Sequence, residues 1–139
     1  MTTIIYNSAV PLEIKQSIGH LLTTVDVFCP PWLETVHIDL PEDRSDDEFC
    51  YQITAEFEYR RCRIDIGRFY IQRSYEERLE GLVHELMHVY TSPLETLIHH
   101  LLGAHDLLED PAWDLLFTQS REMTVQDLSH LVRRLSPVE

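Results

Sequence analysis

The chain is short of basic residues. Its 139 residues include 11 lysines and arginines against 24 aspartates and glutamates, which gives a net charge of −13. Sequence-independent binding to nucleic acid needs positive side chains that neutralise phosphates, so this composition argues against a nucleic-acid partner. The negative excess favours solubility and is typical of a solvated acidic surface, although it would also suit a basic partner.

The chain also lacks the sequence signals of membrane proteins and of disulfide-bonded proteins. No apolar run reaches the roughly 20 residues that cross a bilayer, and the N-terminus lacks the basic and apolar stretches of a signal peptide. The three cysteines, Cys29, Cys50 and Cys62, are odd in number and form no C-x-x-C motif, which argues against a disulfide framework or a zinc ribbon. We therefore expect a reduced, cytoplasmic protein without membrane association. No repeat or linker divides the sequence, and residues 1–139 are predicted to form a single domain.

The most informative segment is His84-Glu85-Leu86-Met87-His88, an H-E-x-x-H motif. On a helix, residues i and i+4 lie on one face one turn apart, so both imidazoles can bind one Zn²⁺ at roughly 2.0–2.1 Å. The glutamate that follows the first histidine can then activate a water molecule as general base. Apolar residues on both sides predict a buried helix, and burying these polar groups without a partner would be costly.

Capping signals mark the predicted ends of this helix. Ser74 and Glu77 have the spacing of a capping box, which predicts a helix over 75–91 that ends before Ser92-Pro93. Residues 92–95 form a second capping box with proline at its first helical position, and they predict a separate short helix. Glu95 is explained as the last member of that box.

Hydrophobic periodicity predicts the other elements. Polar and apolar residues alternate most clearly over 49–59, which indicates a strand with one buried face, and Arg60-Arg61 is the expected turn into a return strand. The fold class is therefore α+β, with a small, mainly antiparallel three-stranded sheet packed on the motif helix and on further C-terminal helices. The predicted elements outside the motif region are a helix over 11–25, strands over 35–40, 49–59 and 62–66, and a final helix over 119–135.

A catalytic zinc site takes three protein ligands and leaves one position for water. The pattern H-E-x-x-H-x-x-G-x-x-H is excluded, because Thr91 and Leu94 occupy its glycine and third histidine positions. Glu122 borders the apolar stripe of the final helix, where an inward-facing carboxylate needs a partner, but a first-turn glutamate favoured by the helix dipole explains it equally well. The alternatives are Glu109 and, beyond it, His99, His100 and His105.

With these residues in view, the chain resembles the gluzincin class of zinc metallopeptidases, and within it the very small minigluzincins. It is also similar to short metallopeptidases of phages and bacteria. The resemblance rests on the H-E-x-x-H helix, on the strands before it and on a later helix that carries Glu122, Val125 and Leu128. It implies a zincin-like fold over residues 11–135, with His84, His88 and Glu122 as zinc ligands and Glu85 as general base.

The resemblance further implies a hydrolase that cleaves a peptide or protein substrate, with an edge strand ending near Ile66 that pairs with the extended chain. Larger gluzincins often carry an aspartate four residues after the ligand glutamate. Gln126 stands there instead, with Asp127 beside it, and only His130 and Tyr90 are candidates for stabilising the oxyanion. The alternative interpretation is a non-catalytic zincin-like binding module that retains its zinc. The sequence carries no signal for an oligomeric state.

Overall fold

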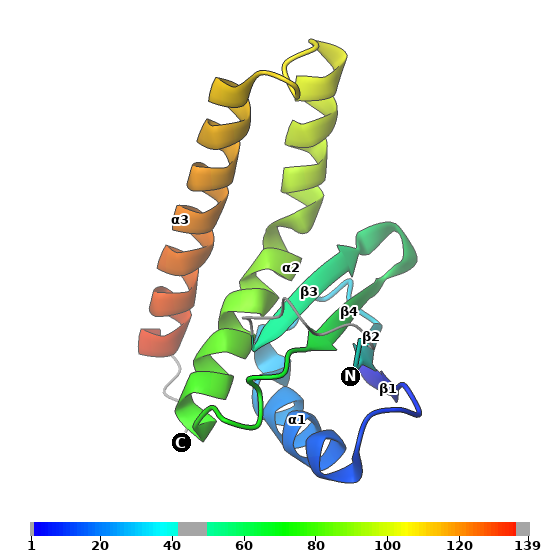
Figure 1. Ribbon diagram of the computed structural model, residues 1–139. Coiled ribbons are helices and arrows are strands. Elements are labelled where there is room, and N and C mark those ends of the chain that lie inside the picture. Colours follow the sequence, from blue (N-terminus) through cyan, green and yellow to red (C-terminus); the bar gives the residue numbers. More distant parts are fainter. Residues whose placement is uncertain (1, 42–49, 136–139) are drawn as a thin grey trace.

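The structure, a computed structural model, describes residues 2–41 and 50–135. Within them it has three helices and a four-stranded mixed sheet, so the predicted α+β class is confirmed at this level (Figure 1). Short 3₁₀ turns lie at Asp26–Phe28 and Phe57–Tyr59. The elements in chain order are β1 (Thr3–Tyr6), α1 (Leu12–Thr24), β2 (Thr35–Asp39), β3 (Tyr51–Glu56), β4 (Arg61–Ile66), α2 (Tyr75–Ala104) and α3 (Pro111–Leu135).

The sheet differs in detail from the prediction of three mainly antiparallel strands. Its order is β1-β2-β4-β3, with β1 parallel to β2, β2 parallel to β4, and β3 antiparallel to β4. The four residues of β1 are too few for a periodic pattern, yet α1 forms the crossover that parallel neighbours such as β1 and β2 require. The predicted strand over 49–59 ends at Glu56, because the chain turns at Phe57–Tyr59 and Arg60 adopts a left-handed φ of 54°. Phe49 lies outside the described residues.

One hydrophobic core joins α1, the central strands and the first half of α2. Ile18 on α1, Ile64 on β4 and Leu82 on α2 are each 0% exposed. The helix α3 contributes Val125 to this core and otherwise packs along α2. Figure 1 shows α2 and α3 as a long antiparallel hairpin whose upper half rises beyond the sheet. No helix in the described part of the chain combines the length and the apolarity that crossing a bilayer requires.

The helix α2 begins as predicted, but it does not end at Ser92-Pro93. The capping box is present, since Glu77 N–H donates to Ser74 Oγ at 3.2 Å and Ser74 N–H donates to Glu77 Oε2 at 2.8 Å. Pro93 has no N–H for the carbonyl of Val89, which is why a break was expected. The hydroxyl of Ser92 donates to that carbonyl at 2.9 Å instead. The lost backbone bond is thereby replaced, and α2 continues for 30 residues.

The helix α3 also begins earlier than the predicted residue 119. Asp110 Oδ1 accepts a hydrogen bond from the N–H of Ala112 at 2.9 Å, and Asp110 O accepts from the N–H of Asp114 at 3.0 Å. Pro111 then occupies the first helical position, where a missing N–H costs nothing. The Asp110-Pro111 pair, interpreted from sequence as punctuation in an irregular segment, therefore starts a helix of 25 residues.

Candidate metal centre

Three potential ligands converge where α3 crosses the H-E-x-x-H turn of α2. Glu122 Oε2 lies 3.7 Å from His84 Nε2 and 3.5 Å from His88 Nε2. One ligand atom from each residue can be chosen so that all lie within 4.8 Å of one another, and no other such group of three occurs in the residues that the structure describes. A cation bound at about 2.0–2.2 Å from each atom would fit between them. The three residues could therefore hold a metal ion.

Helix packing explains why these side chains meet. The histidines lie one turn apart on α2, and the buried neighbours Leu82 and Leu86 fix the rotation of that helix on the core. On α3, Val125 is 0% exposed and packs into the same core. A residue three positions earlier lies on nearly the same face of a helix. The packing of Val125 therefore turns Glu122 toward the histidines.

The other candidates for a third ligand do not join this group. Glu109 and His105 lie in the loop that connects α2 to α3, at the end of the hairpin far from the sheet (Figure 1). His99 and His100 are exposed on the projecting half of α2. Of the residues weighed from the sequence, the structure brings only Glu122 to the two histidines.

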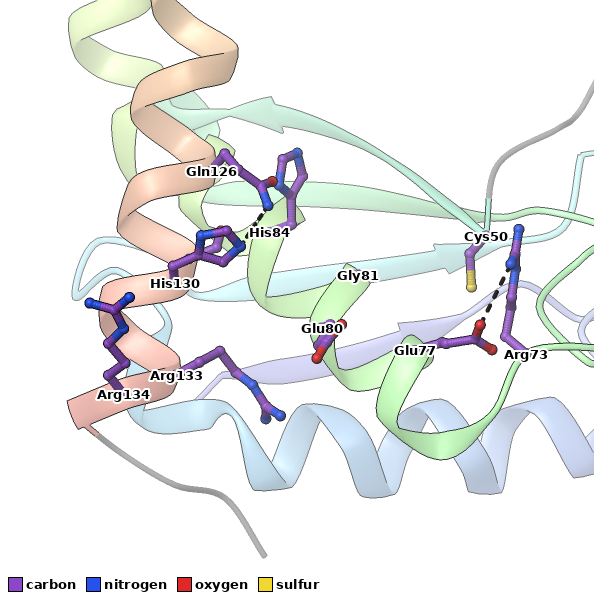
Figure 2. A pocket seen from close by; sticks show the side chains of 11 residues that line it. Cys50, Arg73, Glu77, Glu80, Gly81, His84, Gln126, His130, Arg133 and Arg134 are labelled. Carbon is purple, nitrogen blue, oxygen red and sulfur yellow. Dashed lines mark hydrogen bonds and ion pairs between the residues drawn. The ribbon is translucent and has the colours of Figure 1, made fainter.

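His84 is supported from α3 by Gln126, the residue that stands in place of an aspartate. Figure 2 shows the Gln126 side chain between the rings of His84 and His130, and its Nε2 lies 2.8 Å from His130 Nε2. Burial and the neighbouring His88 lower the pKa of His84, against the opposing effects of Glu122 and of a hydrogen bond with Gln126. A lowered pKa keeps this imidazole neutral at pH 7, which is the form that binds metals.

His88 has an outer partner that the sequence did not suggest. Glu95 Oε1 lies 3.9 Å from His88 Nδ1, on the side of the ring away from Glu122, and accepts a hydrogen bond from Thr91 Oγ1 at 2.8 Å. Burial alone would lower the pKa of His88, but Glu95 together with the charges of Glu122 and Glu85 raises it. Carboxylates commonly orient metal-binding histidines in this way. The available signal was the seven-residue spacing, which places Glu95 two turns from His88 once the helix continues through Pro93.

Glu85 lies beside the ligand group without belonging to it. Its carboxylate is mostly buried and accepts a hydrogen bond from the backbone N–H of Ile53 on β3. Burial raises the pKa of Glu85 from its ordinary 4.5 to about 7, with Glu122 acting in the same direction and His88 opposing. A carboxylate with a pKa near 7 can both accept and donate a proton at neutral pH.

Two cavities border the site. One, of about 540 Å³, is lined by residues of β3 together with Glu85, His88 and Glu122, and the other, of about 720 Å³, includes His84, Gln126 and His130 (Figure 2). The strand beside the site is β3, which among the described residues pairs only with β4 and has no strand on its other edge. The expectation that the edge strand ends near Ile66 is wrong, because Ile66 lies on β4, between β2 and β3.

Three residues proposed from the sequence as oxyanion stabilisers or outer partners differ in whether they line these cavities. His130 lines the larger cavity, whereas Tyr90 and Asp127 line neither of the two.

No protein-family model matches this chain, and neither the curated proteins nor the solved structures give a match. The chemistry of the site therefore has to be argued from its geometry: a possible metal site, an adjacent carboxylate of perturbed pKa, and an open strand edge.

Proposed function

We propose that the protein is a zinc-dependent metallopeptidase of the gluzincin type, with a minimal zincin-like fold. The observation that supports this best is the convergence of His84, His88 and Glu122 beside Glu85. Two imidazole nitrogens and one carboxylate oxygen form a ligand set of catalytic zinc sites, which leave a fourth position for water or substrate. The resemblance to gluzincins points to the same four residues.

The free edge of β3 supports a peptide as substrate. An extended peptide that adds to a sheet edge satisfies the unpaired backbone groups there, and side-chain pockets supply specificity. Ile53, on this strand, already donates its N–H to Glu85. A peptide laid along β3 would therefore pass next to the general base and the ligand group, in the cavity of about 540 Å³.

Bound zinc would polarise the peptide carbonyl and lower the pKa of a water molecule toward about 7. Glu85 accepts the proton of the attacking water and afterwards donates it to the leaving amine, a double role that suits its raised pKa. Gln126 and Glu95 lie beside the rings of His84 and His88, outside the site, where they would orient the two imidazoles once a metal is bound. His130 lines the cavity next to His84 and is our candidate for stabilising the oxyanion.

Hydrolysis of a mixed-sequence peptide library by the zinc-loaded protein tests this proposal. We expect Glu85→Gln to lower the cleavage rate by roughly 100- to 10,000-fold while zinc content stays the same, because only the proton carrier is lost. Glu76→Gln is the matched control, since Glu76 is exposed in the first turn of the same helix and should leave the rate unchanged. Equal cleavage by wild type and Glu85→Gln would contradict the role of Glu85.

A non-catalytic binding module is the second candidate. The observation that favours it is the hydrogen bond of Gln126 with His84, because a neutral amide makes a histidine ligand less basic than an aspartate does. A protein that binds zinc through the three ligands, binds library peptides and cleaves none of them would support the binding module. The same result would contradict the peptidase.

A further inference from the structure

We propose that the projecting half of the α2–α3 hairpin is a dimerisation arm that pairs with the arm of a second copy of this chain. The proposal goes beyond the metal site and does not depend on it. It starts from an apolar stripe on α2 that nothing covers in the described part of the chain. This stripe, the arm seam, consists of Tyr90, Leu94, Leu97 and Leu101, which are 44%, 60%, 55% and 53% exposed.

The arm seam continues the buried face of the same helix. Its members are spaced by four, three and four residues, which places them in one line along α2. Leu79, Val83 and Leu86 lie on the same face one to three turns earlier, and they are at most 1% exposed. The stripe is buried where α2 packs on the core, and no described helix or strand lies over the part that rises beyond the sheet (Figure 1).

The low charge of the α2 half of the arm favours a second copy as the cover. The whole chain has a net charge of −13, so two copies repel each other over most of their surfaces. Among residues 90–104, however, Glu95 is the one aspartate, glutamate, lysine or arginine. Its carboxylate bonds to Thr91 and faces His88 rather than the seam. Two arm seams can therefore meet without bringing like charges together.

The shape of the arm is self-complementary. In an antiparallel pair, Leu94 of each copy lies opposite Leu97 of the other, and Tyr90 lies opposite Leu101, so one twofold axis closes the contact. Next to the seam, a mainly apolar cavity of about 130 Å³ opens between α2 and α3. Its lining includes Leu94, Ile98 and Phe117, with Glu95 and Arg121 at its side toward the metal centre. A leucine of the second copy can enter it, and the two hairpins then form a four-helix bundle.

The available area predicts a dimer of modest strength. Residues 90–104 extend over about 22 Å at 1.5 Å per residue, and two adjacent helices are about 20 Å wide. The contact would cover about 450 Å² on each copy, or about 900 Å² in total, which is the size of weak, transient interfaces. We therefore expect a dissociation constant on the order of 1–100 μM.

Sedimentation equilibrium of the full chain tests the proposal. We expect the mass of the wild type to rise from one chain to two as its concentration passes through the micromolar range. Leu97→Glu should stay at one chain over the same range, because it places a charge in the seam of each copy. His100→Glu adds the same charge to an exposed position of the same helix outside the seam, and it should dimerise like the wild type.

Three results would overturn the proposal: a wild type that stays at one chain throughout, a Leu97→Glu variant that dimerises as strongly as the wild type, or masses that grow beyond two chains. The first would assign the seam to a different partner, and the third would mean that the contact does not close. Circular dichroism shows whether Leu97→Glu is folded, and Leu101→Glu provides a second seam variant. The double variant His84→Ala/His88→Ala should dimerise normally, so failure of the dimer and failure of the metal site are distinguishable.

Discussion

The two halves of α2 carry the same kinds of residue in opposite surroundings. Residues 75–89 bury their leucines against the core and hold His84 and His88 next to Glu122 and β3. Residues 90–104 expose three of their four leucines, and His99 and His100 on this half join no metal group within the described residues. Histidines on a helix therefore become candidate ligands through the elements that pack around them, because only residues 75–89 are held in place by the core, β3 and α3.

The largest expected effect is a difference in unfolding free energy between two leucines of this one helix. Leu82 is 0% exposed, so Leu82→Ala should cost about 2–5 kcal/mol, from the lost transfer free energy and the cavity that remains. Leu97 is 55% exposed, and Leu97→Ala should change the stability by less than about 0.5 kcal/mol. Urea denaturation in dilute solution, below the concentration of dimer formation, measures both. Similar losses for the two variants would show that the halves are equally packed.

The next effect concerns Glu85, whose carboxylate is mostly buried on residues 75–89 of α2. The pKa of Glu85 is raised to about 7, so this group's contribution to the stability of the metal-free protein is fully present below about pH 4.5 and is lost as the pH rises through about 7. Glu85→Gln removes this cost and should be more stable than the wild type by roughly 2 kcal/mol at about pH 8, but not at about pH 4. Chemical denaturation with a chelator present measures the difference, and an advantage that is independent of pH would contradict the explanation.

The smallest effect tests the junction between the halves. Ser92→Ala should cost about 1 kcal/mol, because the carbonyl of Val89 loses the donor that replaces the missing N–H of Pro93. Ser129→Ala is the matched control. Its hydroxyl donates to the carbonyl of Val125 at 2.8 Å, but that carbonyl lies in a helix without a proline at this point and keeps its backbone bond. Thermal melting of both variants should show the larger loss for Ser92→Ala, and an equal loss would contradict the proposed continuation.

Capping motifs and hydrophobic periodicity correctly predicted the features that depend on interactions between residues close in the sequence. The capped helix around His84 and the alternation at Tyr51 and Ile53 correspond to α2 and β3, because capping and periodicity act over a few residues. The continuation through Pro93 was not predicted, because Ser92-Pro93 also has the pattern of a helix start. The sequence alone does not show that the Ser92 hydroxyl donates to the carbonyl of Val89 and so replaces the missing N–H. The parallel pairing of β1 with β2 depends on the crossover through α1, which no short pattern contains.

The site was predictable to a similar degree. His84, Glu85 and His88 follow from one helical turn, whereas the third candidate required the register of α3 on α2, which Val125 sets. The support of His88 by Glu95 depends on the helix continuing past Pro93, so the error at the proline also concealed this partner.

Zinc content of untagged protein, measured by elemental analysis after dialysis, shows whether His84, His88 and Glu122 bind the metal. We expect about one zinc per chain for the wild type, for Glu85→Gln and for Glu109→Gln. His84→Ala and His88→Ala should lose the metal, and Glu122→Gln should weaken its binding by at least roughly 10-fold. Zinc content that is unchanged in both histidine variants would contradict the account, as would zinc that depends on Glu109 rather than on Glu122.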